Sequence, residues 1–255
     1  MKPEDRIKKK NKKVCVLFSV LFFLSSVLCL LSCSNQSSAP DPENGKPQHT
    51  PQKFDAPPVI LSILPVESAG AMYERFVPLK YYLENVLKRP VIIKVAKDYE
   101  TAIREIGSGE SHLSFLDPAA YCEVRARYAN KVTPLVRPVG REGATSRSVL
   151  VVKSGSGTEK AADIKGRRLA LGAKQSSFSY LIPLAMLNDV GIRTKDFNSV
   201  DFLQQEDRVA LSVLIGDHDV GAMSESVARK YKEDGLKVIK SSEAIPAFVF
   251  CDPLI

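Results

Sequence analysis

Residues 168–191 read RLALGAKQSSFSYLIPLAMLNDVG, and this segment passes from a strand pattern into a helix pattern. Arg168–Leu171 is a short apolar run typical of a buried strand, and residues 178–190 repeat apolar side chains with helical spacing up to Gly191. A strand that leads into a helix is the repeating unit of α/β proteins. The segment therefore predicts an α/β fold.

The same alternation continues on both sides of this segment. We expect strands at 59–64, 91–95, 113–116, 199–203 and 220–223, and helices beginning at Pro78, at 99–106 before Gly107, near Pro118, and at 206–215 before Gly216. Residues 149–153 and 245–250 could cross between two lobes. These elements predict a two-lobed clamshell, in which each lobe is a mixed sheet flanked by helices, two crossover strands join the lobes, and a ligand cleft lies between them.

The first 32 residues have the layout of a secretory signal. Seven basic residues precede an uncharged, mostly apolar run at 14–31, and Leu30-Leu31-Ser32-Cys33 resembles the lipobox of bacterial lipoproteins. We predict a lipoprotein signal peptide at 1–32, with Cys33 carrying the lipid that holds the protein at the cell membrane or outer membrane. The alternative is an uncleaved membrane anchor, since eighteen residues can just span a bilayer. Either interpretation makes the rest of the chain extracytoplasmic.

Residues 33–58 contain six prolines and almost no large apolar side chain, which is typical of a tether and not of a folded core. We assign 59–147 to lobe I, 148–244 to lobe II and 245–255 to a crossover that returns to lobe I. Cys122 and Cys251, which lie in the lobes, could pair in an oxidising compartment or remain buried free thiols.

Composition and motifs exclude several classes of protein. The formal net charge is +7, but the first 32 residues hold seven basic and two acidic residues, which leaves a surplus of only two positive charges for the remainder. A nucleic-acid partner is therefore not expected. The sequence lacks a His-Glu-x-x-His motif, a Gly-x-Ser-x-Gly motif and a P-loop. We expect no enzyme activity, no catalytic residues, no metal and no cofactor.

Ser176 and Ser177 fall where a helix begins after a strand. Free backbone N–H groups, hydroxyls and the positive end of the helix dipole all favour an anion at such a position. The alternative is that the two serines only cap the helix.

From residue 59 to about residue 250 the chain resembles the phosphate, phosphite and phosphonate solute-binding proteins of ABC importers. The resemblance depends on a series of segments in register: FVPLKYYLE at 76–84, DY at 98–99, FLDPAAY at 115–121, RSVLVV at 147–152, ADIKG at 162–166, QSS at 175–177 with LIP at 181–183, VALSVL at 209–214 and IP at 245–246. It implies the periplasmic binding fold, a small oxyanion ligand, an ABC permease as partner, and a monomer.

The resemblance also implies which residues contact the ligand. Gln175, Ser176 and Ser177 would form the anion-binding turn of lobe II. Leu116, Asp117 and Tyr121 would line the cleft from lobe I. Glu206 stands where the family usually has a His that donates to the phosphonate, and Phe248 stands where aminophosphonate binders have an Asp for the amine. Asp117 replaces a common Gly, and Phe178 replaces a small residue.

These departures change the expected specificity. A carboxylate near a phosphonate dianion is repulsive unless one of them is protonated, so Glu206 and Asp117 should weaken a simple phosphate fit, unless Glu206 points to solvent. Phe248 predicts poor binding of aminoethylphosphonate. Related chains usually continue past the second crossover, so we expect an abbreviated or truncated form ending at Ile255.

Two alternatives to an importer's binding protein for a phosphorus oxyanion remain. One is a ligand-sensing input module for a membrane sensor, and the other is a binding protein re-purposed for another small solute.

Overall fold

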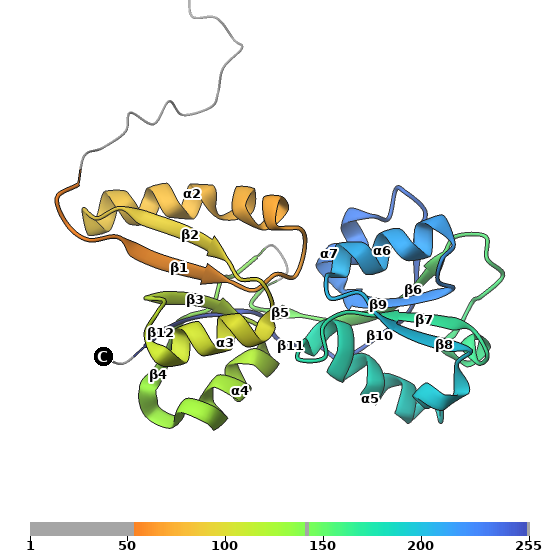
Figure 1. The fold of residues 1–255 in the computed structure, drawn as a ribbon. Coiled ribbons are helices and arrows are strands. Elements are labelled where there is room, and N and C mark those ends of the chain that lie inside the picture. Colours follow the sequence, from red (N-terminus) through yellow and green to blue (C-terminus); the bar gives the residue numbers. More distant parts are fainter. Residues whose placement is uncertain (1–53, 141–142, 254–255) are drawn as a thin grey trace, which may run out of the picture. The chain divides into compact units, whose positions relative to one another are not determined.

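A computed structural model describes residues 54–140 and 143–253, which belong to one compact unit, Lys53–Ile255. These residues form two α/β lobes, each with a five-stranded sheet (Figure 1). The predicted signal peptide, Cys33 and most of the predicted tether lie outside the described residues. Within the described part of the chain, none of the helices combines the length and apolar character needed to cross a bilayer.

The sheet of lobe I mixes parallel and antiparallel strands in the order β2-β1-β3-β12-β4. The first three run parallel, and β12 is antiparallel to both of its neighbours. Helix α2 packs along β2, while α3 and α4 pack against β12, β3 and β4 (Figure 1). The elements are β1 Val59–Ile63, α2 Ala69–Leu87, β2 Val91–Val95, α3 Tyr99–Ser108, β3 Leu113–Leu116, α4 Pro118–Tyr128, the 3₁₀ turn Ala129–Lys131, β4 Val132–Val136 and β12 Val249–Pro253.

The sheet of lobe II has the order β10-β6-β9-β7-β8 and is buried on both faces. Along β6, Leu150 and Val152 belong to one core cluster and Val149 and Val151 to another, which is the side-chain alternation of a strand. The elements are β6 Ser148–Lys153, 3₁₀ turns Ala161–Ile164 and Thr194–Asp196, β7 Arg168–Leu171, the π-helical turn Ser177–Leu181, α5 Ile182–Asp189, β8 Ser199–Phe202, α6 Glu206–Ile215, β9 Val220–Ser224, α7 Glu225–Lys230 and β10 Leu236–Ser241.

Two short antiparallel strands, β5 Thr145–Ser146 and β11 Ile245–Pro246, pair where the chain passes from one lobe to the other. The prediction that 149–153 is a crossover was therefore wrong. That run is unbroken and apolar because β6 lies inside the lobe II sheet, between β9 and β10, with helices on both faces.

Two predicted helix ends also differ from the structure. Helix α2 begins at Ala69 after the N-cap Ser68, so Pro78 lies inside the helix and not at its start. Pro78 is exposed, and the carbonyl that it leaves without a helical partner can face water. Gly107 does not end α3, which continues to Ser108. A Cβ at Gly107 would lie 2.2 Å from the ring of Tyr128, so this glycine permits α3 and α4 to pack closely.

The two cysteines of the described residues are both free. Cys251 is buried in the lobe I core, as the free-thiol interpretation expected, whereas Cys122 is exposed on α4. Burial, together with the charge of Asp252, raises the pKa of the Cys251 thiol to about 12.

Candidate functional site

The predicted anion-binding turn lies at the start of the helical segment of lobe II. Ser176 is the N-cap, and its hydroxyl accepts a hydrogen bond from the Ser179 N–H at 3.3 Å. Gly172, the first residue after β7, has no space for a side chain, because an added Cβ would lie 2.1 Å from the Ser179 hydroxyl. The turn is thus packed tightly under the helix start, with Ser176 and Ser177 both buried.

The opposing part of lobe I is the start of helix α4. Asp117 is its N-cap, and one carboxylate oxygen, Oδ1, accepts from the Ala120 N–H at 2.8 Å. Pro118 follows at a position that needs no backbone donor. The Asp117 side chain is completely buried.

The two helix starts are hydrogen-bonded to each other. The second oxygen of Asp117, Oδ2, accepts from the Ser177 N–H at 2.9 Å, and the Ser177 hydroxyl accepts from the Ala119 N–H at 2.7 Å. The hydroxyl of Tyr99, on α3, lies 3.4 Å from the same Asp117 oxygen. A carboxylate oxygen of the chain itself is therefore bound to the Ser177 N–H, a donor that the sequence assigned to a ligand.

Burial controls the ionisation of this group. It raises the pKa of Asp117 to about 6, although hydrogen bonds from the backbone of Ala120 and Ser177 and from the hydroxyls of Tyr99 and Ser176 act in the opposite direction. Burial also raises the pKa of the Tyr99 hydroxyl, and the charges of Asp117 and Glu206 add to that effect. Tyr99 is thus a neutral donor at the site.

Glu206, the first residue of α6, faces the interior and not solvent. Its carboxylate accepts from the N–H of Ser224 at 3.0 Å and from the Ser224 hydroxyl at 2.6 Å. Burial raises the pKa of Glu206 to about 7, and the negative charges of Asp117 and Glu67 contribute to the rise. The site therefore holds two buried carboxyl groups that can each take up a proton near neutral pH.

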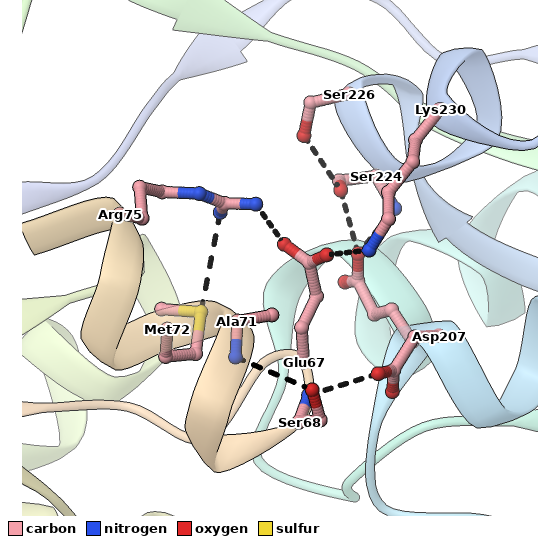
Figure 2. A network of polar contacts seen from close by, with 10 residues as sticks. Glu67, Ser68, Ala71, Met72, Arg75, Asp207, Ser224, Ser226 and Lys230 are labelled. Atoms are coloured by element: carbon pink, nitrogen blue, oxygen red, sulfur yellow. Dashed lines mark hydrogen bonds and ion pairs between the residues drawn. The ribbon is translucent and has the colours of Figure 1, made fainter. Parts of the chain in front are cut away.

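A second set of contacts joins the loop after β1 to lobe II. Figure 2 shows the Glu67 carboxylate between Arg75 of α2 and Lys230 of α7. Glu67 is completely buried, and Lys230 Nζ lies 2.7 Å from its Oε2. Burial acts to raise the pKa of Glu67, but hydrogen bonds and charges from Lys230 and Arg75 outweigh it and the pKa is lowered.

Backbone contacts flank this ion pair. The Ser68 N–H donates to the Asp207 carboxylate at 2.9 Å (Figure 2), and the Glu206 N–H donates to the Val66 carbonyl at 2.7 Å. We call Glu67, Arg75, Lys230, Ser68 and Asp207 the latch. Glu67, Tyr99 and Ser224 were not predicted as site residues. Tyr99 belongs to the Asp98-Tyr99 segment of the family resemblance, whereas the signal for Glu67 and Ser224 was only their position near the beginning of a helix or the end of a strand, where α/β proteins place ligands.

Aromatic rings connect the lobes beside the site. Phe248 stacks on Phe115 of β3, with ring centroids 4.6 Å apart and an interplanar angle of 7°. It also lies 5.9 Å from the ring of Phe178, which belongs to the lobe II turn and is completely buried. Phe248 is therefore an apolar wall between the lobes.

The remaining predicted site residues lie elsewhere. Leu116 is buried in the core of lobe I, at the end of β3, and its place in the cleft lining stays a prediction. Tyr121 lines a cavity of about 440 Å³ together with Cys122, Leu135 and other residues of lobe I and the β11–β12 segment. Gln175 is half-buried.

A separate cavity of about 320 Å³ opens beside Tyr99. Its lining comes from both lobes and includes two cationic side chains, Lys97 and Arg208. Among the described residues, no cluster of three or more His, Cys, Asp or Glu side chains could hold a metal ion.

Two α/β lobes whose helix starts meet at a buried anionic group define a two-lobed substrate-binding protein of the periplasmic type. Within this class, the family model described as "ABC transporter, phosphonate, periplasmic substrate-binding protein" matches residues 61–251, and the chain belongs to this family. It is thus an extracytoplasmic substrate-binding component of an ABC importer, and members of the family are transport proteins and not enzymes.

Individual relatives are distant in sequence but share the fold. The Phosphate-import protein PhnD of Mycolicibacterium smegmatis is 25% identical over 223 residues, which cover 80% of this chain and 69% of that protein. A binding protein component of an ABC phosphonate transporter from Pseudomonas aeruginosa superposes with a TM-score of 0.71 at 19% identity, covering 78% of this chain and 69% of its own. PhnD1 from Prochlorococcus marinus, solved with methylphosphonate, gives a TM-score of 0.71 at 17% identity, with coverage of 77% and 76%.

Proposed function

We propose that the chain binds a small oxyanion of the phosphate, phosphite or phosphonate type between its lobes and delivers it to an ABC permease. The observation that carries the proposal is the convergence of the Ser177 N–H and the Tyr99 hydroxyl on one anionic oxygen of Asp117. Donors arranged in this way around a buried position select an anion. Lys97, Arg208 and Asp98 line the cavity beside Tyr99, so the lining carries one net positive charge next to one of these donors.

Release of the ligand requires no chemistry, only a change in the contacts between the lobes. The proposal therefore includes no catalytic residue and no cofactor. We also propose a lipoprotein signal peptide at 1–32, a lipid on Cys33, a tether at 33–58, and lobes at 59–147 and 148–244 with a return segment at 245–255. We propose that the protein is a monomer whose lobes are held away from the membrane surface by the tether.

The test is titration calorimetry with the full chain purified in detergent, at pH 5.5 and pH 7.5. Phosphate, phosphite and methylphosphonate are the ligands, and sulfate is the reference anion. Ser177→Ala removes a hydroxyl at the site, and Ser156→Ala removes one from an exposed turn of lobe II. We expect at least one phosphorus oxyanion to bind. Ser177→Ala should weaken binding about tenfold, since hydrogen bonds to charged groups contribute about 1.5–3 kcal/mol, and Ser156→Ala should not.

A second candidate function is a binding protein for a different small solute. The buried carboxyl groups of Asp117 and Glu206 favour it, because they make the site more acidic than a simple phosphate site. Absence of binding by all three phosphorus oxyanions at both pH values would reject the first proposal and leave this one.

A further inference from the structure

We infer that Asp117 is an intramolecular competitor for the anion site: its carboxylate occupies the donors of lobe II, holds the two helix starts together without a ligand, and must leave before an external oxyanion can bind. This inference rests on the proposed function, because it assigns a specificity-determining role to one residue of that same site.

The two oxygens of the Asp117 carboxylate accept hydrogen bonds from different lobes. Oδ1 accepts from Ala120 in its own helix at 2.8 Å, and Oδ2 accepts from Ser177 in lobe II at 2.9 Å. A phosphonate or phosphate oxygen that bound the Ser177 N–H would need the position that Oδ2 holds. Both groups cannot occupy it, since one N–H makes one strong hydrogen bond.

The contact to lobe II is not a requirement of helix capping. Asp98 caps α3 as Asp117 caps α4, with its carboxylate accepting from the Thr101 N–H at 2.7 Å. Asp98 is only half-buried, and its hydrogen bonds remain within its own helix. Helix capping accounts for the hydrogen bond that Oδ1 of Asp117 accepts from Ala120. The other oxygen, Oδ2, is not needed for capping and can hold the position of a ligand oxygen.

An external ligand that displaces the Asp117 carboxylate must compensate the free energy of the contacts that this carboxylate loses. The carboxylate would lose a charge-assisted hydrogen bond with Ser177 and the donor from Tyr99, and no solvent reaches its present position. A ligand that competes with a tethered group faces a high effective concentration of that group. Removal of the carboxylate should therefore tighten the binding of external oxyanions by at least tenfold.

The test uses three variants of the full chain in detergent. Asp117→Ser keeps a residue that caps helices well, removes the charge and leaves space at the site. Asp117→Asn keeps the size and a capping residue, but an NH₂ group replaces one of the two carboxylate oxygens and cannot accept the hydrogen bond from Ala120 or from Ser177. Asp98→Asn makes the same change at a helix cap whose side-chain hydrogen bond stays in lobe I; because Asp98 also lines the cavity beside Tyr99, this variant is a control for exchange at Ala119 and Ser177 and not for binding. Circular dichroism melting identifies any variant that fails to fold, and Asp117→Asn then replaces Asp117→Ser.

Two readouts follow. Without ligand, hydrogen exchange followed by mass spectrometry should be faster in peptides that contain Ala119 and Ser177 for both Asp117 variants, and unchanged for Asp98→Asn. With ligand, calorimetry should give at least tenfold tighter binding of phosphate or methylphosphonate to Asp117→Ser.

The outcomes separate this inference from the proposed function. Unchanged exchange, or affinity that stays equal or falls in a folded Asp117→Ser protein, overturns the inference even if the wild type binds phosphate. If no phosphorus oxyanion binds the wild type or Asp117→Ser, the proposed function and the competition fail together. Faster exchange in the Asp117 variants then still supports the role of this carboxylate in holding the helix starts together.

Discussion

The ammonium group of Lys230 lies 2.7 Å from a carboxylate oxygen of Glu67, although the two residues are 163 positions apart in the chain. Glu67 is completely buried, and its charge is compensated by Lys230 and by Arg75. A buried charge that loses its partner lowers the free energy of unfolding. The pair therefore favours the arrangement in which the β1 loop lies against α7.

Removal of the lysine tests this contact. We expect Lys230→Met to lower the free energy of unfolding by about 1 kcal/mol, because Lys230 is partly exposed and Arg75 still compensates Glu67. That change corresponds to about 2–4 °C in melting temperature. Lys232→Met, at an exposed position two residues further on, is the matched control. Equal melting temperatures for the two variants would show that the contact between Lys230 and Glu67 adds nothing to stability.

The buried acids predict an unusual dependence of stability on pH. The folded pKa of Asp117 is about 6 and that of Glu206 about 7, both above the ordinary values of 3.8 and 4.5. Between about pH 4 and pH 7 the folded state therefore binds more protons than the unfolded state, and the free energy of unfolding falls as the pH rises. The effect is on the order of 3 kcal/mol for each group.

Thermal melts between pH 4.5 and pH 8 measure this dependence. Glu206→Gln should flatten the slope between pH 5 and pH 7. Asp98→Asn should not, because the pKa of Asp98 is lowered and this residue stays ionised over the range. A melting temperature that rises steadily to pH 8 would contradict the prediction.

Affinity for a phosphorus oxyanion should also depend on pH. Protonation of Glu206 or Asp117 removes negative charge beside the ligand, so binding should tighten as the pH falls from 8 to 6. The ratio of the wild-type affinity to that of Glu206→Gln cancels the titration of the ligand itself. We expect this ratio to change about tenfold over the range, as measured by calorimetry; a constant ratio would exclude Glu206 from the effect.

Aminoethylphosphonate should bind at least tenfold more weakly than methylphosphonate. Phe248, stacked between Phe115 and Phe178, offers the amine no salt-bridge partner, and an unpaired ammonium in a closed site is costly. Competition calorimetry with the two compounds compares them directly. Tighter binding of the amine would instead place it on a carboxylate such as Glu206.

Close packing between α3 and α4 predicts opposite effects for two glycine substitutions. Gly107→Ala should lower the free energy of unfolding by about 1–3 kcal/mol, because its Cβ would meet the Tyr128 ring at 2.2 Å. Gly70→Ala, in the first turn of α2 with no atom within 4 Å of the added Cβ, should leave stability unchanged or raise it by up to about 1 kcal/mol. Urea titrations would measure both, and a Gly107→Ala protein as stable as wild type would mean that the helices can separate at little cost.

Local patterns were enough for much of the fold. The strands Val91–Val95, Leu113–Leu116 and Arg168–Leu171 and the helix Glu206–Ile215 were predicted with the ends that the structure shows. The predictions were wrong where one sequence pattern is compatible with two different structures. Pro78 can begin a helix or lie on its exposed face, and an apolar run such as 149–153 can cross between lobes or fill the centre of a sheet.

The candidate site was only partly predictable. The family resemblance named five ligand-contacting residues that lie at this site: Ser176, Ser177, Asp117, Glu206 and Phe248. That they contact a ligand stays a prediction. The sequence did not indicate that Asp117 would bind Ser177 or that Tyr99 would lie beside them, since matching segments do not show which of their residues meet, and Glu67 belongs to no such segment.

The sequence by itself determined the order of strands and helices, the α/β class and the helix start at Ser176, because periodicity and capping act within a few neighbouring residues. Only the tertiary structure decided which groups meet: Asp117 with Ser177 across 60 positions, and Glu67 with Lys230 across 163. Such contacts depend on how two separately packed sheets are joined at β5 and β11. That geometry arises from packing over the whole of both lobes, which a local pattern does not contain.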